Sequence, residues 1–123
     1  MIRRLYIDNY KCLVNFELPL QEATLLLGPN GAGKTSVLDV VFALRRLLSG
    51  QVKVTDADAF PSATLTRWQS RKIQTVEMDV LLDSEEIRYR LEIEHRRATG
   101  EARIIVERLE SGKRPLFVFE KGE

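Results

Sequence analysis

The sequence has few of the features that stabilise secreted or membrane proteins. Cys12 is the only cysteine, so no internal disulfide can form, as is typical of a reducing compartment. We expect Cys12 to be a small, buried or half-buried apolar residue, because no Cys/His set accompanies it as a metal site. No apolar run could span a bilayer, and Tyr6, Asp8 and Lys11 interrupt the N-terminal stretch that a signal peptide would need. We therefore expect a cytoplasmic protein with no membrane partner.

The chain also lacks an excess of charge of either sign. Its 19 basic and 18 acidic residues give a net charge of +1, so no global field draws it to nucleic acid or an anionic membrane. The 44% of hydrophobic residues among 123 are enough for the core of one globular domain. His95 is the only histidine, and it stands between Glu94 and the pair Arg96-Arg97. We expect a surface histidine there, not a catalytic one.

The stretch Gly28-Pro29-Asn30-Gly31-Ala32-Gly33-Lys34-Thr35 is the strongest functional signal. It fits the phosphate-binding pattern G-x-x-x-x-G-K-[ST] at every fixed position. The glycines allow successive backbone N–H groups to turn toward an anion, and Lys34 supplies positive charge for the β- and γ-phosphates. Thr35 would offer its hydroxyl to Mg²⁺ at the start of a helix, whose N-terminus carries partial positive charge. The pattern predicts ATP with Mg²⁺ as cofactors.

The alternative is a glycine-rich turn that only joins a strand to a helix. The sequence context favours phosphate binding, since the loop follows the apolar run Ala23 to Leu27 and precedes a helical pattern. That run does not alternate, which is typical of a strand covered on both faces. Upstream, apolar residues between Ile2 and Ile7 and between Leu13 and Leu18 predict two strands of a hairpin around Asn9-Tyr10-Lys11.

The segment from Lys34 to Ser49 has a helical period. Further apolar residues widen its main apolar stripe around most of the helix, so we expect the helix to lie between two sheets. The stripe consists of Val37, Val41, Leu44 and Leu48, and the widening residues are Leu38, Val40, Phe42 and Leu47. In this interpretation the stripe contacts one sheet, while Leu38 and Phe42 contact another. Gly50 is a plausible C-terminal cap.

Residues 51–72 are expected to form a loop, and a period of two then begins. Alternation from Val76 to Phe119, punctuated by Thr99-Gly100 and Ser111-Gly112, predicts an antiparallel meander over residues 73–120. The predicted fold is an α/β P-loop NTPase lobe, in which the phosphate-loop helix packs between a mixed core sheet and the β meander. Residues 1–123 would form one ATP-binding lobe, with strands, P-loop and helix in residues 1–50, and would belong to a larger ATPase.

This order of elements, with Gly28-Pro29-Asn30-Gly31 and with Ser36 after Thr35, resembles the N-terminal lobe of ABC-type ATPases of the SMC/RecF/overcoming-lysogenization-defect group. The resemblance covers most of the chain and is sharpest from Leu26 to Leu38. It implies that residues of the loop and the first helical turn surround the phosphates, that Thr35 ligates Mg²⁺, and that Lys11 lies near the nucleotide. The implied cofactor-binding residues are Asn30, Gly31, Ala32, Gly33, Lys34, Thr35, Ser36 and Lys11.

The family's remaining catalytic motifs are not found convincingly in this sequence. Leu48-Ser49-Gly50-Gln51 superficially resembles the signature but closes a helix, and Val80-Leu81-Leu82-Asp83 resembles an acidic strand end but belongs to a hairpin pattern. We therefore assign no catalytic residue. By resemblance, hydrolysis requires a second ATPase lobe or a homodimer partner across the nucleotide, and DNA binding is implied by resemblance alone.

Three functional hypotheses follow. The first is the ATP-binding half of an ABC-type ATPase, inactive as this chain alone. The second is a non-hydrolysing binding module whose shape or partner affinity depends on nucleotide. The third is a small P-loop kinase or GTPase, and the absence of a base-recognition or lid motif in the sequence weighs against it.

Overall fold

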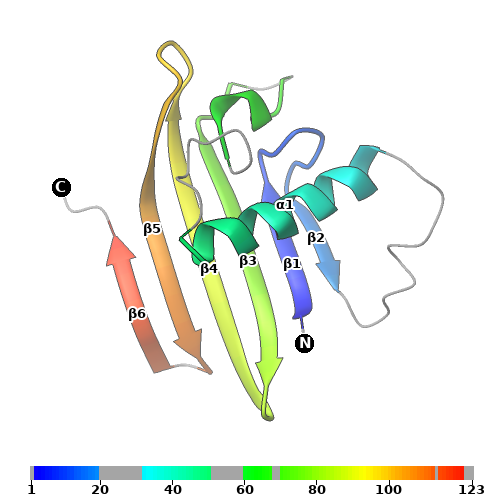
Figure 1. Ribbon diagram of the computed structural model, residues 1–123, viewed down its shortest axis with the longest axis vertical. Helices are drawn as coiled ribbons and strands as arrows, with labels where there is room; N and C mark the ends of the chain where they lie inside the picture. Colours follow the sequence, from blue (N-terminus) through cyan, green and yellow to red (C-terminus); the bar gives the residue numbers. More distant parts are fainter. Residues whose placement is uncertain (1, 20–31, 51–59, 68–69, 113, 121–123) are drawn as a thin grey trace.

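The computed structural model describes residues 2–19, 32–50, 60–67, 70–112 and 114–120. These residues form one six-stranded antiparallel sheet, one long helix on a face of that sheet and one 3-10 turn (Figure 1). In chain order the elements are β1 (Ile2–Asp8), β2 (Phe16–Pro19), α1 (Ala32–Leu48), η2 (Ser62–Thr64), β3 (Ile73–Leu82), β4 (Glu85–Arg96), β5 (Glu101–Ser111) and β6 (Arg114–Glu120). The predicted strand from Ala23 to Leu27 lies outside the described residues.

The strand order across the sheet is β2-β1-β3-β4-β5-β6. The N-terminal hairpin forms as expected, with Leu5 opposite Leu18, and β1 also pairs with β3, where Leu5 lies opposite Met78. The β3–β4 turn is made by Asp83 and Ser84, both at positive φ, as a tight two-residue hairpin requires. The hairpin and the meander therefore belong to one sheet.

The period-two pattern gives this sheet two chemically different faces. Apolar side chains of the central strands, such as Leu5, Val76 and Leu91, are 0–1% exposed on the face that carries α1. The opposite face carries arginines and carboxylates in ion pairs, among them Arg4 with Glu77 at 2.7 Å. Because successive side chains of a strand point to opposite faces, alternation places one set in the core and the other in solvent.

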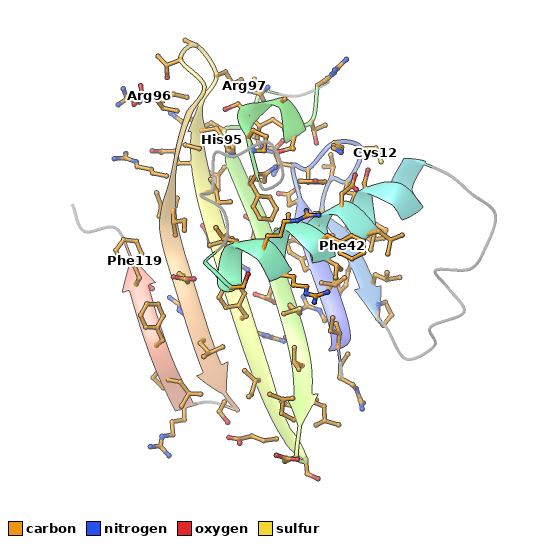
Figure 2. The ribbon with its side chains drawn as sticks, in the orientation of Figure 1. Cys12, Phe42, His95, Arg96, Arg97 and Phe119 are labelled. Atoms are coloured by element: carbon orange, nitrogen blue, oxygen red, sulfur yellow. The ribbon has the colours of Figure 1, made fainter. Side chains whose placement is uncertain are left out.

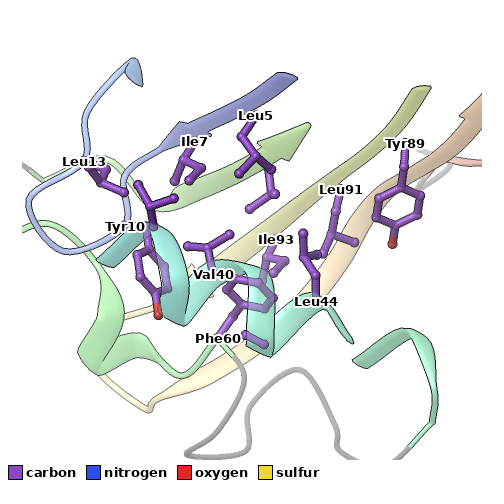
Figure 3. Close-up of a cluster of buried hydrophobic side chains, with 13 residues drawn as sticks. Leu5, Ile7, Tyr10, Leu13, Val40, Leu44, Phe60, Tyr89, Leu91 and Ile93 are labelled. Atoms are coloured by element: carbon purple, nitrogen blue, oxygen red, sulfur yellow. The ribbon is translucent and has the colours of Figure 1, made fainter. Parts of the chain in front are cut away.

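Helix α1 crosses the apolar face of the sheet and completes the core (Figures 1 and 3). Val37, Val40 and Leu44 recur at helical spacing and are at most 2% exposed. They pack with strand residues and with the ring of Phe60, which is fully buried. The helix ends where predicted, since Gly50 has φ +76° and its N–H donates to the Leu47 carbonyl at 3.1 Å.

The expected two-layer cover of α1 is not seen within the described residues. All described strands form one sheet on one side of the helix, and on the other side Leu38 is 36% and Phe42 48% exposed. The prediction that these two residues contact a second sheet is therefore not confirmed by the described residues. The helical period correctly predicts apolar residues on this outer side of α1, but periodicity does not identify the surface that covers them.

Candidate functional site

The phosphate-binding motif leads directly into α1. Gly28 to Gly31 lie outside the described residues, whereas the backbone of Ala32, Gly33, Lys34 and Thr35 forms the first helical turn. That turn contains no acidic residue, so no carboxylate there offsets the partial positive charge of the helix N-terminus. The predicted helix thus begins within the motif, at the end of α1 nearest the β1–β2 connection (Figure 1). The side chains of residues 32–35 are outside the description.

A buried asparagine anchors the β1–β2 connection. Asn9 has φ +64°, a conformation that asparagine tolerates better than most residues, and it is fully buried. Its side-chain amide donates to the carbonyls of Arg71 (2.8 Å) and Ile73 (3.1 Å), and its Oδ1 accepts from the N–H of Thr66 (3.1 Å). Asn9 therefore ties the end of β1 to the segment before β3, which holds the next three residues in place.

Those three residues lie against the N-terminal half of α1. Tyr10 is 2% exposed and packs edge-on against Phe60, with ring centroids 5.9 Å apart. Lys11 Nζ lies 5.5 Å from the Tyr10 ring centroid and 2.9 Å from Oδ2 of Asp39 on α1. Burial raises the pKa of Tyr10 to about 12, and the nearby Asp39 carboxylate adds to this shift. The connection is thus docked on the helix by packing, charge and a cation–π contact.

Two predicted site residues, Lys11 and Ser36, are brought to the same region. Ser36 is 4% exposed, and its Oγ lies 3.7 Å from Sγ of Cys12, the neighbour of Lys11. Cys12 itself is exposed, so the expectation of a buried or half-buried apolar cysteine is wrong. Burial was inferred from the usual preference of a free cysteine for apolar surroundings, but Cys12 lies in a turn of the β1–β2 connection. Residues 35 and 39 are one helical turn apart, so the Lys11 ammonium lies beside α1 about 6 Å along the axis from the level of Thr35.

The Lys11–Asp39 pair leaves both groups accessible. The two side chains are 44% and 40% exposed, and exposed pairs of this kind contribute only about 0.2–1 kcal/mol. A phosphate group could therefore compete for the Lys11 ammonium at small cost. Asp39 was not among the predicted site residues, and no local pattern indicates its contact with Lys11, because the two residues are 28 positions apart.

His95 is buried within β4, so the prediction of a surface histidine is wrong. Figure 2 labels His95 together with its neighbours Arg96 and Arg97. The exposed fraction of His95 is 0%, and its ring lies 3.1 Å from both the Ser62 hydroxyl and Oε1 of Gln74. Gln74 uses its amide nitrogen to donate to the Asn9 carbonyl (3.1 Å) and to Thr64 Oγ1 (3.0 Å), so its Oε1 accepts from His95 Nε2–H. His95 Nδ1 then accepts from Ser62.

The hydrogen bonds of Ser62, His95 and Gln74 form one network that reaches Asn9, because Gln74 also donates to the Asn9 carbonyl. The network therefore supports the β1–β2 connection from inside the fold. Burial lowers the pKa of His95, and the positive charge of Arg97 lowers it further, which favours the neutral ring. The alternation of β4 placed His95 on the same face as Leu91 and Ile93, and this was the signal for its burial. The neighbouring pair Arg96-Arg97 outweighed that signal in the sequence analysis.

The two sequence segments set aside as false catalytic motifs have structural roles. Ser49 and Gly50 close α1, with the Ser49 N–H donating to the Arg45 carbonyl at 3.1 Å. Asp83 is in the β3–β4 turn, at the end of the sheet away from the start of α1 (Figure 1). Neither the helix end nor the β-turn is placed to act on a phosphate at the α1 N-terminus.

Comparisons with known proteins agree with this organisation. A family model described as an AAA ATPase domain matches residues 1–112. The chain is 46% identical over 41 residues to an OLD nuclease of Thermus scotoductus, a match that covers 33% of this chain and 8% of that protein. It is 39% identical over 66 residues to the DNA replication and repair protein RecF of Erwinia tasmaniensis, covering 48% of this chain and 18% of that protein.

The matches therefore span less than a fifth of the length of either relative. Within the described residues no helix is both long and apolar enough to cross a membrane. The family model covers far more than half of the sequence, and both relatives are of the kinds named in the resemblance. This chain belongs to the AAA ATPase domain family and is similar to the OLD and RecF members of the P-loop ATPases.

Proposed function

We propose that this chain is an ATP-binding lobe that holds Mg-ATP at the N-terminus of α1. In this proposal the amides of the loop and the first helical turn surround the phosphates, Lys34 meets the β- and γ-phosphates, and Thr35 ligates Mg²⁺. Asn30, Gly31, Ala32, Gly33 and Ser36 complete the cradle, and Lys11 approaches from the β1–β2 connection. The observation that carries the proposal is the complete G-x-x-x-x-G-K-[ST] sequence leading into a helix, within a chain of an ATPase family.

The packing around α1 supports this position for the site. The helix is held on the sheet by Val37, Val40 and Leu44, which fixes the direction in which its N-terminal amides point. The docked connection adds a cation, Lys11, beside the same half of the helix. A rigid helix with positive charge near its N-terminus is suited to an anionic ligand, because little reorganisation is needed on binding.

We further propose that hydrolysis requires a second lobe or a dimer partner across the nucleotide. Phosphoryl transfer needs a positioned water and charge stabilisation beyond the phosphate cradle, and this sequence supplies the cradle alone. The alternative is a non-hydrolysing module in which ATP changes affinity for a partner. Adding a second ATPase lobe discriminates between these functions, since only the first predicts turnover in that combination. A cytoplasmic location is part of the same proposal.

Thermal unfolding with and without Mg-ATP tests nucleotide binding. Nucleotide at ~100 times its dissociation constant should stabilise the fold by about 2.7 kcal/mol, because it binds the native state and not the unfolded chain. Lys34→Ala should abolish most of the shift, and omission of Mg²⁺ should reduce it. Lys72→Ala is the matched control, since Lys72 is an exposed lysine in the segment before β3. Folded protein that shows no shift, or equal shifts in the two lysine variants, would contradict the proposed site.

DNA is proposed as a partner of a complete assembly only. The name of the Erwinia relative associates that protein with DNA replication and repair. On the charged face of the sheet each of five arginines pairs with a carboxylate: Arg4, Arg88, Arg90, Arg103 and Arg108. The paired carboxylates balance the charge of these arginines, so that face carries no excess of positive charge to attract a polyanion such as DNA. Electrophoretic mobility shift with this chain alone should show no binding that is retained at physiological salt.

A further inference from the structure

Asp39 is an acidic residue on α1 to which the proposed nucleotide site gives no role. It stands four residues after Thr35, so positions 35 and 39 share one face of the helix, about 6 Å apart along its axis. A carboxylate this close to a phosphate site opposes an anionic ligand by charge repulsion. Its ion-pair partner in the described part of the chain is Lys11, whose Nζ lies 2.9 Å from Oδ2 of Asp39. The role of Asp39 at this end of α1 therefore depends on Lys11.

The backbone around Lys11 is held in place, whereas its side chain can rotate. The Lys11 N–H donates to the Thr64 carbonyl at 2.5 Å, and the next residue, Cys12, lies with its Sγ 3.7 Å from Oγ of Ser36 on α1. A lysine side chain is a flexible four-carbon stem that ends in three rotatable donors. The ammonium can therefore change its partner without a movement of the β1–β2 connection.

The γ-phosphate of ATP is the group best placed to become the second partner. In a phosphate-binding loop the backbone amides surround the α- and β-phosphates, and Mg²⁺ at the Ser/Thr position bridges β- and γ-oxygens. Lys11 contacts the face of α1 that carries positions 35 and 39, which is the Mg²⁺ side of the proposed site. A γ-phosphate carries more negative charge than one carboxylate, so it attracts the ammonium more strongly at equal distance. ADP has no such group.

We propose that Lys11 and Asp39 together determine the preference of this lobe for ATP over ADP, an inference that rests on the proposed nucleotide site. In the arrangement described, Asp39 holds the Lys11 ammonium beside α1. The γ-phosphate of Mg-ATP takes the ammonium from Asp39, whereas ADP leaves the pair intact. Asp39 thus weakens the binding of ATP, and the contact of Lys11 with the γ-phosphate outweighs this loss.

The alternative is an ion pair that only docks the β1–β2 connection on the helix. Other contacts already provide that docking. Tyr10 packs edge-on against Phe60, and the Asn9 side chain donates to the carbonyls of Arg71 and Ile73. A purely structural pair would affect both nucleotides alike, which makes the two interpretations separable by experiment.

Isothermal titration calorimetry of the whole chain with Mg-ATP and with Mg-ADP tests the proposal. Lys11→Met should raise the dissociation constant for Mg-ATP about tenfold and that for Mg-ADP less than about twofold, because ATP alone loses a charge-assisted hydrogen bond. Lys11→Arg keeps the cation and should preserve the preference for ATP. Asp39→Asn should lower the dissociation constant for Mg-ATP about two- to fivefold, since the ammonium no longer leaves a carboxylate.

The double variant Lys11→Met/Asp39→Asn separates exchange of the ammonium from a general effect of the Asp39 charge. Its dissociation constant for Mg-ATP should lie within about twofold of that of Lys11→Met, because Asp39 acts through Lys11. Asp83→Asn and Lys72→Met are the matched controls, since they make the same charge changes in the β3–β4 turn and before β3. Both controls should leave the two dissociation constants unchanged, and urea unfolding verifies that every variant is folded.

Two results would overturn the proposal while leaving the nucleotide site intact. One is an equal loss of affinity for the two nucleotides in Lys11→Met. The other is a gain from Asp39→Asn that persists in the absence of Lys11. Lys34→Ala distinguishes these results from a failure of the site itself, because that variant should lose both nucleotides whatever Lys11 does. A folded parent chain that binds neither nucleotide would refute the site and the Lys11–Asp39 pair together.

Discussion

A neutral histidine holds the polar network behind the candidate site. The neutral ring of His95 donates to Gln74 and accepts from Ser62, whereas a protonated ring would place a positive charge in a fully buried position near Arg97. Because burial and Arg97 lower the pKa of His95 in the folded protein, the unfolded chain binds the proton more readily than the folded one. Protonation of this one residue therefore opposes folding.

We predict that the free energy of unfolding falls as pH drops below 6.5, the ordinary value for histidine, toward the lower folded pKa. The loss from His95 is at most about 1.4 kcal/mol per pH unit in that window and is absent above it. Urea unfolding at about pH 7.5 and about pH 5.5 measures it. In His95→Gln the difference between these two pH values should shrink. An equal difference in the variant would show that other groups dominate the window.

Glu77 is a second residue whose charge matters to folding. It is 7% exposed, and it accepts from Arg4 at 2.7 Å and from Arg90 at 2.8 Å. Burial alone would raise the pKa of Glu77, but these hydrogen bonds outweigh burial and lower it below 4.5. Because the pKa of Glu77 is lower in the folded protein, its contacts with the arginines stabilise the fold at pH values above the pKa of Glu77 in the unfolded chain. This stability is lost as pH falls through the pKa of Glu77 in the folded protein.

We predict that Glu77→Gln destabilises the domain by about 1–3 kcal/mol at neutral pH, because it leaves two arginines without their charged acceptor. Glu101→Gln is the control, since Glu101 is exposed at the start of β5. Chemical denaturation of both variants gives the comparison. If the Glu77 and Glu101 variants are equally stable, the contacts of Glu77 with Arg4 and Arg90 contribute nothing measurable to the free energy of unfolding.

At the scale of elements, α1 is packed on one side and open on the other. Leu44 is 2% exposed against the sheet, whereas Phe42, two positions earlier, is 48% exposed. The free energy of burial depends on the apolar area removed from water, so the two residues differ in what they contribute to folding. Phe42 has the larger side chain, but it contributes less than Leu44 to the stability of a single copy.

We predict that Leu44→Ala costs about 2–5 kcal/mol and Phe42→Ala less than about 1 kcal/mol in dilute protein, where copies are separate. Denaturant unfolding of each variant at low concentration provides the measurement. A cost for Phe42→Ala that approaches that of Leu44→Ala under these conditions would mean that a further part of the same chain covers the ring.

At the scale of the whole molecule, the packing of α1 on the described sheet places the start of α1 beside the β1–β2 connection. The described residues supply the phosphate-loop helix and its supports, and both relatives are much longer proteins. The proposed function assigns nucleotide binding to these residues and assigns the chemistry to their combination with another lobe or copy.

We predict that purified chain shows no ATP turnover above that of Lys34→Ala. The reason is that a phosphate cradle binds ATP without positioning the attacking water. A phosphate-release assay on both proteins, with nucleotide binding confirmed by the thermal shift, measures this. Robust hydrolysis that disappears in Lys34→Ala would show that a water-positioning group and a charge donor lie within these residues.

Local patterns in the sequence were enough to predict the described strands and the helix with its glycine end, and to identify the phosphate-binding motif. Alternation and helical period are set by the backbone geometry of neighbouring residues, and the motif is contiguous, so neither depends on distant contacts. Tertiary structure alone decided that hairpin and meander share one sheet, that Phe42 lies outside, and that His95 lies inside. It also brought Lys11 to Asp39, because pairing across 28 positions depends on how β1 and α1 pack on each other, which no short window of sequence records.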